Sequence, residues 1–227
     1  MSKQTEKQSK QKLILINILL LLVAVAYTLI VKYVDVQAIG PQLSKVGLGT
    51  INKAYWDLIG YNEFWYKVTK YLGVVPFLIV AFYGLQGLLQ VIKTKSILKV
   101  DKKILSLGGF YVLVGATYVL FEKVIINYRP VLEDGKLEAS FPSSHTMLAV
   151  CICLSSLLIS KYYVKNEKIR KLFDIGTVIL MLVLVIGRLL SGVHWFSDIL
   201  GGVIISLFLV SIYHTLINVL KDEKKSQ

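Results

Sequence analysis

Six long apolar segments, separated by shorter polar ones, dominate the pattern of this chain. A membrane-crossing helix needs about 20 mainly apolar residues, because it rises ~1.5 Å per residue through about 30 Å of hydrocarbon. The segments reach this length and lack the alternation of strands, and a helix satisfies its own backbone polar groups in lipid. We therefore expect transmembrane helices near Leu13–Val31, Tyr71–Ile92, Ile104–Phe121, Thr146–Val164, Leu172–Leu190 and Ile199–Leu220.

The predicted fold class is all-α: a bundle of six transmembrane helices that makes residues 1–227 a single domain, with tails at 1–12 and 221–227. Hydrophobic residues make up 55% of the chain and charged residues 18%, whereas soluble domains have roughly 45–50% and about 25%. This composition excludes a disordered chain, a basic nucleic-acid module and a disulfide-stapled secreted domain. The first segment is long for a signal peptide and no clear cleavage motif follows it, so we interpret it as a retained anchor.

Basic residues are unevenly placed along the chain. Most of the 26 Lys and Arg lie in four places: the N-terminal tail, the second-to-third and fourth-to-fifth connections, and the C-terminal tail. The positive-inside rule places these segments, and hence both termini, in the cytoplasm. The net charge of +12 then reflects topology and anionic membrane lipids, and it indicates no nucleic acid and no obligatory protein partner. We expect a multi-pass protein of a bacterial plasma membrane.

Two arginines lie in the connections on the opposite, extracytoplasmic side. Arg129 follows the third span, Arg188 ends the fifth, and Lys123 lies close before Arg129. Charged groups at membrane depth are costly and are usually kept for function. Because guanidinium groups bind phosphate oxygens in pairs, this cluster predicts a phosphate-binding site.

A helix start precedes the fourth span. Pro142, Ser143 and Ser144 have the pattern of a capped N-terminus, and His145 follows them directly. Free backbone N–H groups and the helix dipole favour an anion at such an end. The turn is thus predicted to hold a phosphate and to direct His145 at it. The alternative is an ordinary capped helix in which the histidine has no role.

His194 and Asp198 are four residues apart at the start of the sixth span, which puts them on one helix face. A carboxylate bonded to one imidazole nitrogen fixes the tautomer and leaves the other nitrogen as a nucleophile or base. One alternative is a structural His–Asp hydrogen bond. Another is a metal site with His145, which the neighbouring cations disfavour. We expect no metal and no cofactor.

Other notable residues have simpler interpretations. An aromatic segment between the first two spans predicts an interfacial amphipathic helix, in preference to a substrate-specific role. Two cysteines at i, i+2 point to different helix faces, so they are interpreted as packing residues that do not pair. The aromatic residues are Tyr55, Trp56, Tyr61, Trp65 and Tyr66, the cysteines are Cys151 and Cys153, and His214, Tyr213 and Asp174 are interpreted as structural.

These motifs resemble a known family. Arg129-Pro130, the Pro142–His145 turn, and Arg188-x5-His194-x3-Asp198 with Gly201-Gly202 following are similar to the three signature motifs of the type 2 phosphatidic acid phosphatase family. That family includes bacterial undecaprenyl-diphosphate phosphatases, and its six-span plan agrees with the one predicted here. The resemblance implies metal-independent hydrolysis of a lipid phosphate or diphosphate. A lipid-binding or transport protein and a phosphotransferase remain as alternatives.

The resemblance also implies roles for individual residues. His194 is the nucleophile that becomes a phosphohistidine, Asp198 orients it, and His145 is the general acid and then the base. The phosphate oxygens are bound by Arg129, Arg188, Lys123 and the backbone of Ser143 and Ser144. Because His194 must be neutral and His145 protonated, kcat/KM is expected to be bell-shaped in pH.

The chain departs from the family pattern at three positions. Ser144 and Gly187 stand where the family usually has glycine and serine. Glu122 occupies the position of the family's lysine, and Lys123 follows one residue later.

Overall fold

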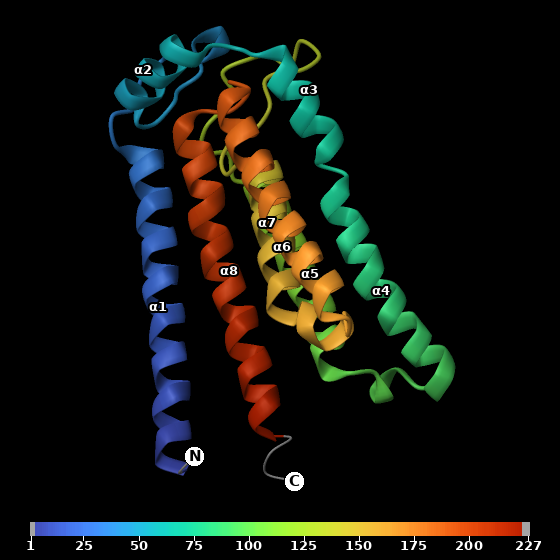
Figure 1. Ribbon diagram of the computed structural model, residues 1–227. Coiled ribbons are helices and arrows are strands. Elements are labelled where there is room, and N and C mark those ends of the chain that lie inside the picture. Colours follow the sequence, from blue (N-terminus) through green and yellow to red (C-terminus); the bar gives the residue numbers. More distant parts are fainter. Residues whose placement is uncertain (1–2, 224–227) are drawn as a thin grey trace.

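The computed structural model describes residues 3–223 as an all-helical bundle (Figure 1). Six of its helices are long and apolar enough to cross a membrane, which confirms the predicted six spans. The long helices are α1 (Lys3–Tyr33), α4 (Val75–Thr94), α5 (Lys102–Lys123), α6 (Ser144–Tyr163), α7 (Glu167–Leu190) and α8 (Phe196–Glu223). The short ones are α2 (Gly49–Ile59), α3 (Glu63–Leu72) and the 3-10 turns η1 (Pro41–Leu43) and η2 (Ile97–Lys99).

The ends of the spans differ most from the prediction in two places. Helix α1 begins at Lys3, so most of the expected tail at 1–12 continues the helix, while residues 1–2 and 224–227 lie outside the described residues. The second apolar helical stretch runs over Glu63–Thr94, because α3 continues into α4 after a break at Gly73 and Val74. Pro76 follows this break in the first turn of α4, where its missing N–H costs no helical hydrogen bond.

Helix α6 is the centre of the bundle. In its most apolar stretch 61% of the residues are buried, against 11–33% in the other five spans. It contacts α4, α5, α7 and α8, and small side chains such as Ala149, Ser155 and Ser156 permit this close packing. Cys151 and Cys153 are free and fully buried there, as predicted for packing residues.

Two glycines of α8 bring this helix close to the start of α6. A side chain at Gly201 would collide with the ring of Phe141, and one at Gly202 would press on Thr146 and the Ser143 backbone. The glycine pair therefore lets α8 approach the Phe141–Ser143 segment, and this approach places Asp198 next to the α6 N-terminus.

The connections divide between the two ends of the bundle. The beginning of α1, the end of α8 and the lysine-rich α4–α5 and α6–α7 connections lie at one end (Figure 1). Helix α2 and the 124–143 connection lie at the other end, together with the α7–α8 turn. Every motif residue singled out above therefore lies at or near the end of the bundle opposite the beginning of α1 and the end of α8.

The aromatic segment forms α2 and α3. Helix α2 is amphipathic, as predicted, but it is also tied to the α7–α8 turn. The Tyr55 hydroxyl donates to the Leu189 carbonyl at 3.2 Å, and the Trp56 indole donates to the Gly192 carbonyl at 3.2 Å. The segment thus supports the turn that carries His194.

Candidate active site

The α7–α8 turn delivers His194 into the protein interior. Gly192 adopts a left-handed conformation (φ 65°), and a side chain there would collide with the Gly60 carbonyl. Such a conformation strains any residue with a Cβ, so glycine allows the tight turn. Two residues later His194 is 2% exposed, and Asp198, in the first turn of α8, is 0% exposed.

His194 and Asp198 are joined through a third residue. The His194 Nδ1 atom lies 4.0 Å from Asp198 Oδ2, which is beyond a hydrogen bond. The Ser140 hydroxyl lies between them, 3.0 Å from Nδ1, and donates to Oδ2. The direct His–Asp hydrogen bond expected from the i, i+4 spacing is therefore replaced by a serine bridge, because the 124–143 connection inserts Ser140 at this point.

Asp198 is held by further donors. The Trp195 backbone N–H donates to Oδ2 at 3.0 Å, and the Asn127 side chain donates to Oδ1 at 3.1 Å. These bonds satisfy the buried carboxylate and fix its orientation.

The other ring nitrogen of His194 is unused. Nε2 is buried and has no hydrogen-bond partner among the described residues. Burial lowers the pKa of His194 well below its ordinary value, and the positive charges of Arg129 and Arg188 lower it further. The imidazole is therefore neutral near pH 7.

The N-terminus of α6 supplies free donors beside this histidine. Ser143 is the N-cap residue, and its backbone N–H donates to the Asp198 carbonyl at 3.0 Å, which ties α6 to α8. Its hydroxyl makes no capping bond and is buried without a partner in the described structure. The first N–H groups of the helix likewise have no intrahelical acceptor. The predicted helix start is confirmed, and its donors are available for a ligand.

Arg188 is almost fully buried, with 1% exposure. Nη1 donates to the Thr69 hydroxyl at 3.2 Å, Nη2 lies 3.1 Å from His145 Nδ1, and the guanidinium carbon is 5.6 Å from the centre of the Tyr66 ring. A side chain at Gly187 would collide with Thr69. The glycine that replaces the family's serine therefore makes room for α3, whose threonine supplies a hydroxyl to Arg188.

Arg129 is paired with two carboxylates. Nη1 contacts Glu133 and Nη2 lies 3.3 Å from Glu138. Glu133 also accepts the Tyr66 hydroxyl at 2.9 Å. Burial raises the pKa of Glu133, but Arg129 and the Tyr66 hydrogen bond outweigh this effect, so its pKa lies below the ordinary value. Two isolated β-bridges within the 128–139 segment, Tyr128–Ala139 and Glu133–Lys136, pair the two sides of this loop with each other.

Lys123 is separate from this cluster. Lys123 is the last residue of α5 and its side chain is exposed. Within residues 3–223 the structure shows no contact between it and the two arginines. Glu122, one residue earlier, instead lines a small cavity with His194, Ser144 and Tyr118. A shift of one residue turns a helix by about 100°, so Lys123 points away from the position of the family's lysine.

The site contains five residues that the motifs did not predict. Four of them bond directly to a motif residue, and Tyr66 bonds to one of these four, Glu133. No sequence signal identified them directly, although some of them lie close to a motif in the sequence. They are Tyr66, Thr69, Asn127, Glu133 and Ser140.

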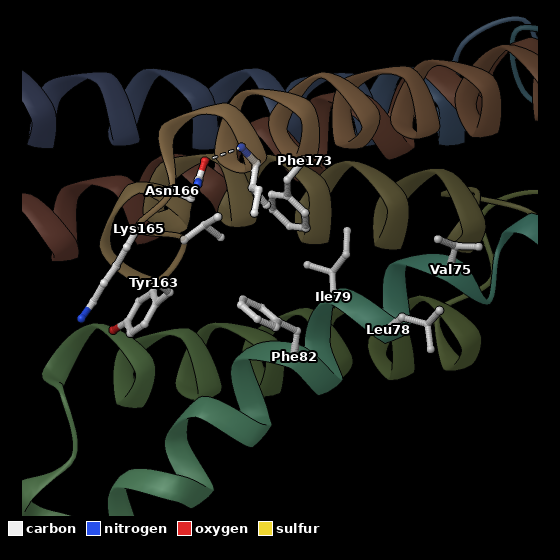
Figure 2. Close-up of a pocket in the computed structure, with 10 residues that line it drawn as sticks. Val75, Leu78, Ile79, Phe82, Tyr163, Lys165, Asn166 and Phe173 are labelled. Carbon is white, nitrogen blue, oxygen red and sulfur yellow. Dashed lines mark hydrogen bonds between the residues drawn. The ribbon is translucent and has the colours of Figure 1, made fainter.

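Two cavities differ in their chemistry. His145 and Ser144 line a cleft of about 250 Å³, whose other walls include Pro76, Phe77 and Leu148. A larger pocket of about 520 Å³ runs along α4 from Val75 to Phe82 as far as the α6–α7 connection at Asn166 (Figure 2). Its lining is mostly apolar and Lys165 is its single charged residue. Converging polar groups mark a reaction site, so the smaller cleft beside His145 is the candidate.

The fold and this cluster define a polytopic membrane protein with a buried cluster of histidine, arginine and aspartate side chains at one end of its bundle. The chain belongs to the PAP2 superfamily, whose sequence profile matches residues 76–222. Its fold is similar to the crystal structure of the first transmembrane PAP2 type phosphatidylglycerolphosphate phosphatase from Bacillus subtilis, with a TM-score of 0.57 and 19% identity. The similarity covers 89% of this chain and 96% of the other. No curated protein sequence matches this chain.

Proposed function

We propose that this protein is a phosphatase that hydrolyses a lipid phosphate or diphosphate through a phosphohistidine intermediate. One observation carries the proposal: the buried, unpartnered Nε2 atom of His194 lies in a cluster that contains two arginines and a free helix N-terminus. A neutral imidazole nitrogen without a partner is either a defect of packing or a group kept for a ligand. Here the surrounding donors favour a ligand.

The unused donors fit a phosphoryl group. Arg129 Nε, Arg188 Nε and the Ser143 hydroxyl are all buried without a partner among the described residues. A phosphoryl group has several oxygens that can accept from such donors, and arginine matches its geometry. Phosphoryl transfer relies mainly on positioning and charge stabilisation, which this set of residues supplies.

The chemistry divides into two displacements. In the first, the Nε2 lone pair of His194 attacks phosphorus, the bond to the leaving oxygen breaks, and His145 donates a proton to that oxygen. In the second, water attacks phosphorus and gives a proton to His145, and the P–N bond breaks to release inorganic phosphate. The covalent step replaces one difficult displacement with two easier ones, and neither step requires a metal.

The walls of the cleft favour a lipid substrate. Beside His145 the cleft is lined by Pro76, Phe77, Leu148 and Leu184. The carbon chain of a substrate whose phosphate lies at His145 would therefore contact apolar side chains. A lipid keeps its tail in the bilayer while its head group reaches the arginines. Undecaprenyl diphosphate, phosphatidic acid and phosphatidylglycerol phosphate all carry a terminal phosphate, and each is a candidate.

We infer that the site faces the extracytoplasmic side of the plasma membrane. The lysine-rich connections lie at the other end of the bundle, and the positive-inside rule assigns that end to the cytoplasm. Single cysteines in place of Asp134 and Lys99, in a chain whose two native cysteines are buried, test this inference. An impermeant thiol reagent should label position 134 and not position 99 in intact cells, and the reverse result would overturn the orientation.

The activity is tested with purified protein in detergent. With a chelator present, the protein should release phosphate from at least one of the three lipids, and His194→Ala should abolish release. His214→Ala removes an imidazole from the opposite end of α8 and is the matched control. Release by His194→Ala at the wild-type rate would overturn the nucleophile. Binding without release would indicate the lipid-binding alternative, and phosphate passed to an alcohol in place of water would indicate a phosphotransferase.

A further inference from the structure

We propose that Ser140 is a positioning residue whose hydroxyl couples the charge of Asp198 to His194 and fixes the tautomer of that histidine. This inference rests on the proposed function for its catalytic meaning. Ser140 lies outside the three motifs, in the connection between α5 and α6.

The geometry allows no direct hydrogen bond between His194 and Asp198. At 4.0 Å, His194 Nδ1 and Asp198 Oδ2 do not form a hydrogen bond. Ser140 Oγ contacts both atoms, and it is 2% exposed, so water does not compete for them. The Ser140 backbone N–H donates to the Asn127 carbonyl at 2.9 Å, which holds the serine in place.

Counting protons assigns the direction of each bond. An ionised carboxylate only accepts, and the other partners of Asp198, the Trp195 N–H and the Asn127 amide, are donors. The single hydroxyl proton of Ser140 therefore goes to Asp198. Ser140 Oγ then has only lone pairs to offer His194, so Nδ1 must carry the ring proton and Nε2 must carry the lone pair.

This tautomer of His194 is the one that the proposed mechanism requires. The lone pair is on the nitrogen that has no protein partner, and that nitrogen is the proposed nucleophile. The charged and titratable groups around His194 are Arg129 from the connection, Arg188 from α7, His145 from α6 and Asp198 from α8, and Glu122 and Tyr118 from α5 line a small cavity with it. Three of these are cationic or can become so. The Ser140 bridge is therefore the route by which the carboxylate of Asp198, the one hydrogen-bonded to this bridge, stabilises the positive charge that develops on the ring when Nε2 bonds to phosphorus.

The tautomer is directly measurable in the wild-type protein. The chain has three histidines, and 15N labelling of histidine distinguishes a protonated Nδ1 from a protonated Nε2. His194→Ala identifies the signal. We expect Nδ1 of His194 to be protonated at neutral pH. A protonated Nε2 would overturn the proposal whatever the activity of the protein, so this result is independent of whether it is a phosphatase.

The functional consequence is tested with Ser140→Ala. We expect kcat to fall by about 10–100-fold, the range seen when a group that orients a key ligand is removed, with KM changed by less than threefold. Ser140→Thr, which keeps the hydroxyl, should recover most of the loss. Ser206→Ala is the matched control, because it removes an equally buried hydroxyl of α8 that donates to the Gly202 and Met147 carbonyls.

Three outcomes would contradict the role of Ser140. They are full activity in Ser140→Ala, an unchanged His194 signal in that variant, and an equal loss in Ser206→Ala. If the wild type releases no phosphate, the proposed function fails, while the labelling result still decides the tautomer.

Discussion

Nη2 of Arg188 and Nδ1 of His145 are hydrogen-bonded at 3.1 Å. A guanidinium only donates, so Nδ1 of His145 is an acceptor and its ring proton is on Nε2. Arg188 therefore does more than present charge to a phosphate: it orients the neutral ring of His145 in the unliganded protein, and His145 has to take up a second proton, with loss of this hydrogen bond, before it acts as the proposed general acid. The two histidines of the site thus carry their protons on opposite nitrogens, His194 on Nδ1 and His145 on Nε2, and each is set by a different buried partner.

Arg188→Lys tests this double role. Lysine keeps the positive charge, but it lacks the planar fork that reaches Thr69 and His145 together. We expect kcat/KM to fall by roughly 10²–10³-fold, the usual cost of removing one donor from a preorganised charge-stabilising site. Arg170→Lys makes the same exchange near the other end of α7 and should leave phosphate release unchanged. Equal activity of the two variants would show that charge alone suffices at position 188.

Glu133 is bonded to Nη1 of Arg129 in the unliganded protein, so a phosphoryl group that binds this nitrogen has to displace the carboxylate. We expect Glu133→Gln to lower KM, and the inhibition constant of inorganic phosphate, by about fivefold, since a partly exposed ion pair contributes on the order of 1 kcal/mol. Asp134→Asn removes the same charge one residue along the turn and outside the ion pairs of Arg129. A rise in KM for Glu133→Gln would mean that this carboxylate helps to hold the substrate.

The pH dependence of kcat/KM follows from the lowered pKa of His194. The nucleophile must be neutral, so activity should persist as the pH falls through the ordinary histidine range near 6.5 and decline only below it. Removing a positive charge with Arg129→Gln should raise the pKa of His194 and move this decline to higher pH. Ionisation of the free substrate is the same for both proteins, so a displacement between them belongs to the enzyme. Coincident profiles would contradict the assignment.

The lowered pKa of His194 also makes the stability of the protein depend on pH. The unfolded chain protonates this histidine near pH 6.5, whereas the folded protein does so only at lower pH. Proton binding therefore favours the unfolded state, and the free energy of unfolding should fall as the pH drops through about 6.5. His194→Gln should flatten this part of the stability curve, measured by thermal unfolding in detergent.

The six spans and the motif residues were predictable from sequence because both are local signals: apolar runs of sufficient length, and fixed spacings along the chain. The bridge through Ser140 was not, because the i, i+4 spacing of His194 and Asp198 gives no information on what another segment inserts between them. Thr69 was hidden for a related reason. In the sequence, Gly187 indicates only the loss of the contact that a serine would make. In the fold, the missing side chain leaves the space into which α3 packs.

Gly192 links the stability of the fold to the placement of His194. It has a positive φ of 65°, and a Cβ there would overlap the Gly60 carbonyl. Gly192→Ala adds about 1–2 kcal/mol of backbone strain in addition to this collision, and relief of the overlap moves the turn that carries His194. We expect a lower Tm together with a loss of kcat.

Gly176→Ala is the control for this prediction, because its Cβ enters open space within α7. Replacing a mid-helix glycine in this way should stabilise the protein by roughly 0.5–1 kcal/mol and leave kcat unchanged. If both variants have the wild-type Tm and activity, the left-handed turn is not what positions the nucleophile.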